Sequence, residues 1–146
     1  MYHALLSASL LAAATLSDPG IAQSLHGTLY KDPACPCCEG HAAYLKEHGM
    51  ELEIRPVDNL SEISRKAGIP GYFQGCHTIF LEGYVIEGHV SVDLVEKLLS
   101  ERPDDVVGIT LPGMPLGVPG MEGEYSGPYE VQAIKKDGTA RVFGTQ

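Results

Sequence analysis

Asp32-Pro33-Ala34-Cys35-Pro36-Cys37-Cys38 marks the boundary between a strand and a helix in this chain. Before it, the short apolar run Thr28-Leu29-Tyr30 is typical of a strand, and Asp32-Pro33 ends that run. After it, apolar residues recur at the spacing of one helix face from about Cys37 to His48, and Gly49 ends the helix. Three cysteines therefore lie at the start of a predicted helix.

The next segments alternate between strand and helix patterns. Strands are predicted at 51–58, 78–81 and 84–86. One helix is expected to begin after Asn59, with Glu62 at the capping-box position, and to end at Gly68. Another is expected to begin after Ser91. The order strand-helix-strand-helix-strand-strand-helix predicts a parallel pair with a right-handed crossover and an antiparallel hairpin. This is the element order of a thioredoxin fold, so we predict the α/β class, with a mixed sheet flanked by helices.

The composition changes after Pro103. Residues 110–123 are rich in Pro, Gly and Met without periodicity, which predicts a loop. Residues 129–134 and 139–143 flank Lys135-Lys136-Asp137-Gly138, which predicts a terminal β-hairpin. We therefore expect a thioredoxin-like core at 23–103 and, at 104–146, a loop and hairpin extension packed on that core.

Residues 1–22 have the pattern of a signal peptide. The run Ala4 to Leu16 is mostly apolar, and small residues allow cleavage after Ala22 or Ser24. The run is too short to span a bilayer, so no stable membrane insertion is expected. No Lys or Arg precedes it, which leaves a short cytosolic apolar helix as the alternative. We expect a periplasmic or otherwise exported protein.

The charge of the chain excludes one class of partner. Ten Lys and Arg residues stand against nineteen Asp and Glu residues, for a formal net charge of −9. Nucleic-acid binding requires a basic face, so no nucleic-acid partner is expected.

The cysteine cluster carries the candidate chemistry. Cys35 and Cys38 form a C-x-x-C pair at a helix N-terminus, where the helix dipole lowers thiol pKa values and favours thiolate. A disulfide exchange needs only two sulfurs, and Cys37 between them would compete to form wrong bridges. Additional thiolates instead favour a soft metal ion, Cu(I) or Zn(II).

A fourth cysteine precedes the third predicted strand. Thioredoxins and glutaredoxins place a cis-proline there, packed against the C-x-x-C motif, and this chain has His77 at that position, after Cys76. If the two patterns correspond, Cys76 and His77 lie beside Cys35 and Cys38. The predicted metal ligands are Cys35, Cys37, Cys38, Cys76 and His77. The residues alone leave copper and zinc open, because zinc is also held by four thiolates or by three thiolates and an imidazole.

Other residues are weaker candidates for metal binding. His89 either approaches the metal after the fourth strand or ends that strand at the surface. Met114 and Met121 either offer thioether sulfur to Cu(I) or fill gaps in the core. His41 shares a helix face with Cys37 and Cys38, but we interpret it as a solvated helical histidine.

The chain resembles the periplasmic CopG-type copper-resistance proteins from Thr28 to its C-terminus. The resemblance rests on four motifs: Cys35-Pro36-Cys37-Cys38, Gly75-Cys76-His77-Thr78, Gly83-Tyr84-Val85-Ile86-Glu87-Gly88-His89, and Pro112-Gly113-Met114-Pro115 with Pro119-Gly120-Met121. It implies a thioredoxin-like fold and a copper cluster held by the C-x-C-C cysteines together with the Cys-His pair.

The first hypothesis is a periplasmic protein that holds Cu(I), as a single ion or a multinuclear thiolate cluster, for copper resistance, trafficking or conversion between Cu(I) and Cu(II). Its expected partners are copper ions, with other periplasmic copper proteins or an electron donor as protein partners. The alternatives are a thiol-disulfide oxidoreductase using Cys35 and Cys38, and a zinc-binding structural module. Two purely structural disulfides would also account for four cysteines.

Overall fold

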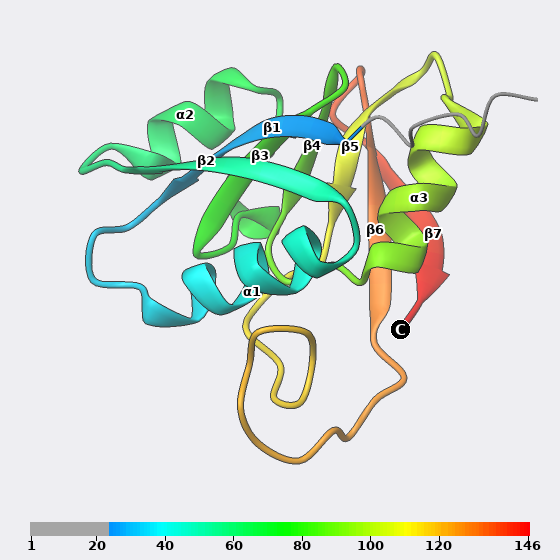
Figure 1. Cartoon of the computed structure of the whole chain (residues 1–146). Coiled ribbons are helices and arrows are strands. Elements are labelled where there is room, and N and C mark those ends of the chain that lie inside the picture. The colour runs from blue at the N-terminus through cyan, green and yellow to red at the C-terminus, as the bar shows by residue number, and fades with distance from the viewer. Residues whose placement is uncertain (1–23) are drawn as a thin grey trace, which may run out of the picture.

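A single mixed sheet of seven strands organises the molecule, which a computed structural model describes for residues 24–146 (Figure 1). The predicted signal peptide at 1–22 lies outside the described residues. The strands lie in the order β2-β1-β3-β4-β5-β6-β7. The elements along the chain are β1 (Leu25–Lys31), α1 (Pro36–Glu47), β2 (Met50–Pro56), α2 (Leu60–Lys66), the short 3-10 helix η1 (Gly71–Phe73), β3 (His77–Leu81), β4 (Tyr84–Glu87), α3 (Val92–Glu101), β5 (Val106–Thr110), β6 (Glu130–Lys135) and β7 (Ala140–Thr145).

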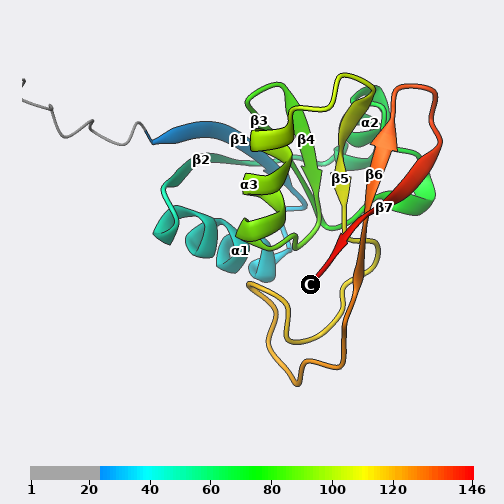
Figure 2. The same ribbon diagram turned by 90° about the vertical axis from the view of Figure 1, so that its right-hand side faces the viewer.

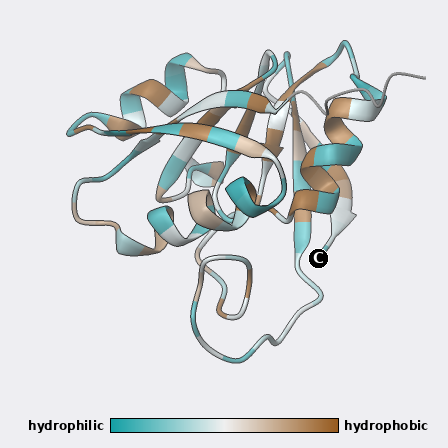
Figure 3. Ribbon diagram, viewed as in Figure 1, coloured by the Kyte–Doolittle hydropathy of each residue, from teal (hydrophilic) through white to brown (hydrophobic). Residues whose placement is uncertain are grey.

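The helices divide between the two faces of the sheet. Alternate strand residues Leu29, Ile79, Ile86 and Ile109 point to the face covered by α1 and α3 and belong to the main hydrophobic core. Val85 and Ile134 point to the other face, where a smaller cluster includes Ile69 beyond the end of α2. Figure 2 shows α1 and α3 side by side on one face, and Figure 3 shows brown apolar bands on the strands and helices.

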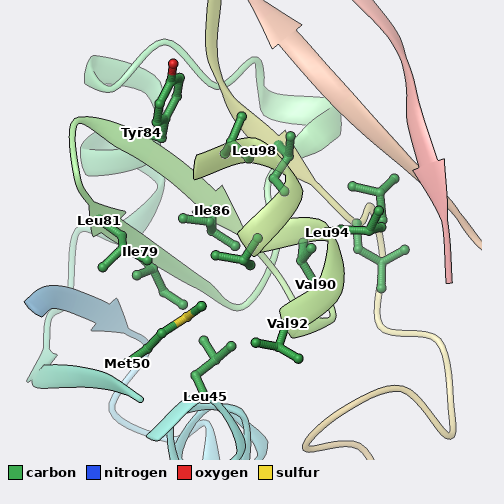
Figure 4. Packing of buried hydrophobic residues seen from close by; sticks show 14 of the residues in the cluster. Leu45, Met50, Ile79, Leu81, Tyr84, Ile86, Val90, Val92, Leu94 and Leu98 are labelled. Atoms are coloured by element: carbon green, nitrogen blue, oxygen red, sulfur yellow. The ribbon is translucent and has the colours of Figure 1, made fainter. Parts of the chain in front are cut away.

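The main core forms between the sheet and the apolar stripes of α1 and α3. Leu45 of α1 and Leu98 of α3 are almost completely buried against strand residues such as Ile79 and Ile86 (Figure 4). Met50 fills the space between α1 and the sheet. Burial of each such side chain contributes about 1.5–3 kcal/mol, so this packing fixes the position of α1 over the sheet.

Most predicted elements are present within a few residues of their expected limits. β1 and β2 are parallel, β3 and β4 form the antiparallel hairpin, and β6 and β7 form the terminal hairpin. The cap of α2 differs from the expectation, because the Asn59 side chain makes no capping hydrogen bond. Ser91 precedes α3 in the same way, without a side-chain bond.

One strand was not predicted. β5 falls where we expected only a change of composition, and it pairs in parallel with β4, so that β5, β6 and β7 extend the same sheet. Gly108 obscures the strand pattern in the sequence. Its role is close packing, because a Cβ at this position would collide with the carbonyl oxygen of Val85. Within residues 24–146, no helix combines the length and apolar character needed to cross a membrane.

The Pro/Gly/Met segment 111–129 connects β5 to β6 as a long loop that extends beyond the sheet (Figure 1) and lies close to the start of α1 (Figure 2). Gly120 packs against the backbone of Gly40 and His41 in α1. Its φ of 79° lies in the left-handed region that favours glycine. A Cβ at Gly120 would collide with the backbone nitrogen of His41, so glycine permits this contact between the loop and the helix.

We expect Gly120→Ala to destabilise the protein more than Gly138→Ala. Gly138 has a φ of 81° and nothing within 4 Å of an added Cβ, so its substitution costs only the backbone preference, about 1–2 kcal/mol. Gly120→Ala adds a steric clash costing about 1–3 kcal/mol more. Urea denaturation of both variants measures the difference, and equal losses would contradict the close packing of loop and helix.

Candidate metal centre

The pairing of β1 with β3 brings the two cysteine segments together. Lys31, the last residue of β1, pairs with His77, the first residue of β3. The segment 32–35 then leads from β1 into α1, with Cys35 at the N-cap and Pro36 in the first turn. Pro36 suits this position because its missing N–H would have no partner there. Cys35 and Cys76 therefore meet at the same end of the sheet.

Four sulfur atoms occupy this position. The Sγ atoms of Cys35, Cys37, Cys38 and Cys76 all lie within 4.8 Å of one another. Cys35 and Cys38 form a disulfide, whereas Cys37 and Cys76 are free. The Cys37 Sγ lies 3.3 Å from the Cys35 Sγ. The structure therefore brings together all four predicted cysteines and shows one redox state of the C-x-x-C pair.

Two histidines approach Cys76 from the interior. The Cys76 Sγ lies 3.3 Å from His77 Nδ1 and 3.4 Å from His89 Nε2. The other nitrogen of His89, Nδ1, donates a hydrogen bond of 2.7 Å to the Pro119 carbonyl oxygen. Because Nδ1 carries the proton in this neutral ring, the lone pair of His89 Nε2 points toward Cys76. Cys76, His77 and His89 form a second group whose ligand atoms lie within 4.8 Å of one another.

His41 differs from the expectation of a solvated helical histidine. It is completely buried rather than solvated, and its Nδ1 lies 2.8 Å from His77 Nε2. Its Nε2 lies 2.8 Å from the Val90 carbonyl oxygen. The helical spacing of His41 from Cys37 and Cys38 was the available indication of this position.

The two methionines of the loop lie at different depths. Met114 has 58% of its surface exposed and lines an open pocket together with Cys35, Cys37 and Cys76. Met121 packs against the main core and lines a neighbouring pocket with Cys37 and Gly40. Both thioethers are therefore near the cysteine segments, Met114 at the rim and Met121 beside the first turn of α1.

The C-terminal residue holds the turn that carries His89. The Gln146 side-chain Nε2 donates a hydrogen bond of 2.9 Å to the His89 carbonyl oxygen, and its Oε1 accepts one of 2.7 Å from the Ser91 backbone N–H. The backbone of Gln146 exchanges two hydrogen bonds with that of Tyr129. The turn between β4 and α3 is thus held from the end of β7.

Burial controls the charge of the candidate ligands. It lowers the pKa of His41 to about 4, and lowers those of His77 and His89, where charge repulsion among the three rings adds to the effect on His41 and His77. It also raises the pKa of the Cys76 thiol to about 12, with a further contribution from neighbouring Cys37. At neutral pH the three imidazoles are neutral and Cys76 is a thiol, so the expected thiolate character does not extend to Cys76 in the metal-free protein.

Glu87 is a buried acid that sequence reasoning did not single out. It pairs with Thr78 across β3 and β4 and accepts a hydrogen bond of 2.8 Å from the Gly75 backbone N–H, next to Cys76. Burial raises the pKa of Glu87 to about 7, although the hydrogen bond from the Gly75 N–H partly offsets this effect. The second carboxyl oxygen, Oε2, is buried and has no hydrogen-bond partner among the described residues. Glu87 therefore anchors the segment that carries Cys76.

We expect Glu87→Gln to remove a pH-dependent loss of stability. Folded Glu87 keeps its proton above pH 4.5, where the unfolded chain releases it, so the wild-type free energy of unfolding falls as pH rises from 4.5 to about 7. The rise in pKa corresponds to at most about 3 kcal/mol. Urea denaturation of both proteins across this range measures the difference, in which the histidine contributions cancel. A constant difference would contradict the raised pKa.

Comparisons with known proteins relate this site to a family. Residues 73–121 match a family described as a protein of unknown function, DUF411. That segment contains Cys76, His77 and His89. No match was found among curated proteins.

Two solved structures are similar to most of the chain. They are described as forms 1 and 2 of the copper resistance protein CopG. Each has a TM-score of 0.77 and 31% sequence identity, with 84% of this chain and 98% of that chain covered. This identity extends over nearly the whole of the CopG chain, and it therefore shows that the present chain belongs to the CopG family of copper resistance proteins.

Proposed function

We propose that this protein binds copper, as Cu(I), through Cys35, Cys37, Cys38, Cys76 and His77, with His89 as a further ligand. The observation that carries the proposal is the convergence of four sulfur atoms within 4.8 Å of one another. Thiolate ligands select soft ions such as Cu(I) over hard cations. The similarity to copper resistance proteins favours copper over zinc.

The arrangement of donors supports more than one copper ion. Cys76 belongs both to the four-sulfur group and to the group with His77 and His89. A thiolate shared in this way can bridge two ions, one in a sulfur-rich position and one in a position with two imidazoles. A single tetrahedral zinc ion would need only four of the six donors.

Copper binding to all four cysteines requires two chemical changes. The Cys35–Cys38 disulfide must accept two electrons and two protons from a reductant such as an external dithiol. Each cysteine must then lose its proton to the solvent when copper binds. The neutral imidazoles of His77 and His89 need no such change, because burial already lowers their pKa values.

The cellular role we propose is copper resistance, copper trafficking, or conversion between Cu(I) and Cu(II) outside the cytoplasm. Conversion would exchange one electron per copper ion with an external redox partner. The apolar run from Ala4 to Leu16 supports export, and the mass of the mature chain would reveal cleavage after Ala22 or Ser24. We also propose that β1 to α3 form a thioredoxin-like core. The neighbouring order β2-β1-β3-β4, with β1 and β2 parallel and β3 antiparallel to both β1 and β4, supports this assignment.

We expect the reduced, exported protein to bind several Cu(I) ions, and Cys76→Ser to bind fewer while remaining folded. Cys76 is the ligand common to both groups, so its loss affects both copper positions. The measurement is copper content after anaerobic loading, with thiol titration before and after. After denaturation, two thiols are expected to react with the titrating reagent in the disulfide form and four in the reduced form. In the folded, reduced protein, bound copper should lower the number of thiols that react.

His26→Asn is the control for this experiment, because His26 is exposed on β1 and belongs to neither ligand group. It should retain the wild-type copper content. Unchanged stoichiometry in Cys76→Ser would remove Cys76 from the site. A single zinc ion, or no metal, in the wild-type protein would contradict copper binding.

The disulfide supports a second candidate function, thiol-disulfide exchange. The Cys35 thiolate would attack a substrate disulfide, which releases one substrate thiol and leaves the other substrate sulfur bound to Cys35 as a mixed disulfide. Cys38 would then attack the Cys35 sulfur, release the second substrate thiol and form the observed Cys35–Cys38 bond. This function predicts that copper-free reduced protein reduces insulin or glutathione disulfide, and that Cys35→Ser abolishes the reaction. His77 at the position of the usual cis-proline argues against it, since that proline normally guides the substrate.

A further inference from the structure

His41 connects a backbone carbonyl group to a proposed metal ligand. We propose that His41 is a positioning residue, which holds the proton of His77 on Nε2 and so leaves His77 Nδ1 available to bind copper. The inference rests on the proposed copper site and assigns the residue that prepares it.

The donor and the acceptor of each hydrogen bond can be assigned in turn, starting from the backbone carbonyl of Val90. Its carbonyl oxygen can only accept, so the His41 nitrogen that lies 2.8 Å away, Nε2, must carry a proton. A neutral imidazole has only one N–H, and the other nitrogen of His41, Nδ1, is therefore an acceptor. His41 is completely buried, which keeps the ring neutral.

The same reasoning then determines the state of His77. His41 Nδ1 lies 2.8 Å from His77 Nε2, so His77 Nε2 must donate the proton of this hydrogen bond. In neutral His77 the remaining nitrogen, Nδ1, carries the lone pair. That nitrogen lies 3.3 Å from the Cys76 Sγ, on the side of the sulfur cluster. The Val90 carbonyl thus specifies the ligand nitrogen of His77 through His41.

The burial of both rings makes this arrangement necessary. His41 and His77 are each 0% exposed, so water does not replace a lost partner. Without an acceptor at position 41, His77 would gain by moving its proton to Nδ1, where it would donate to Cys76. That tautomer would oppose metal binding, because the ligand nitrogen would be protonated.

The backbone also connects the hydrogen bonds of Val90, His41 and His77 to His89. Val90 directly follows His89, and the turn that contains both is closed by a hydrogen bond of 3.0 Å from the Val90 N–H to the Gly88 carbonyl oxygen. The rings of His41 and His89 have centroids 5.0 Å apart. One turn therefore supplies a candidate ligand and also the carbonyl that orients the other imidazole.

Two substitutions at position 41 test the inference. In His41→Asn the side-chain oxygen can replace Nδ1 as the acceptor for His77, whereas His41→Leu has no acceptor. His48→Leu is the matched control, because His48 is exposed at the other end of α1 and its ring nitrogen bonds to the Tyr44 carbonyl oxygen rather than to a candidate ligand. The measurements are nitrogen-15 NMR of the imidazoles in the metal-free protein and Cu(I) affinity by competition with a chromophoric chelator.

We expect wild-type His77 to be protonated on Nε2, and His41→Leu to shift the proton to Nδ1. Loss of an outer-shell partner typically weakens metal binding by about 10–100-fold, so His41→Leu should lose affinity in that range. His41→Asn should recover most of the affinity and the wild-type tautomer, and His48→Leu should change neither.

A proton on Nδ1 of wild-type His77 would overturn the inference, as would equal loss of affinity in His41→Asn and His41→Leu. The NMR result requires no metal, so it is independent of the proposed function. Failure of the wild-type protein to bind Cu(I) would instead refute copper binding and leave the tautomer assignment to be decided by NMR alone.

Discussion

The antiparallel register of β1 and β3 is the constraint on which the candidate metal centre depends. Because Lys31 pairs with His77, the chain that leaves β1 and the chain that enters β3 meet at one end of the sheet. The cysteines of the first segment and Cys76 of the second are separated by 38 residues or more in sequence but by less than 4.8 Å between sulfurs. A shift of one residue would reverse the faces of β3 and move His77 away from α1.

The interior around the site is unusual because it buries polar groups that are paired with one another. His41, His77 and His89 lie with ring centroids 4.9–5.0 Å apart, and each has at least one hydrogen-bonding partner. Burial keeps these rings neutral at pH values where solvated histidines are partly protonated. The same burial holds Cys76 in its protonated form. The three imidazoles and the Cys76 thiol are therefore uncharged at neutral pH, so a cation that binds Cys76 must displace its proton.

The sequence indicated most of the secondary structure and the convergence of the four cysteines. Helix α1 and the two hairpins follow from periodicity and turn residues, which are local properties. β5 was missed because Gly108 interrupts its apolar pattern, and the need for glycine arises only from contact with Val85 in the neighbouring strand. His41 was misjudged for the same reason, since its burial depends on β3 and on the turn after β4. The histidine network and the acid at Glu87 come from tertiary pairing, which a single sequence does not display.

The hydrogen bonds from Gln146 to the turn after β4 have a practical consequence for the purification of the protein. The Gln146 carboxamide bonds to both His89 and Ser91, one residue on each side of the carbonyl that contacts His41. Tyr125 also donates a hydroxyl hydrogen bond of 2.7 Å to the Gln146 backbone oxygen. A histidine-rich affinity tag joined directly after Gln146 would begin beside the buried imidazoles and offer copper a competing set of ligands. An affinity tag placed away from Gln146 would leave the geometry of the turn unchanged and would add no copper ligands beside the site, so the measured copper content would be accurate.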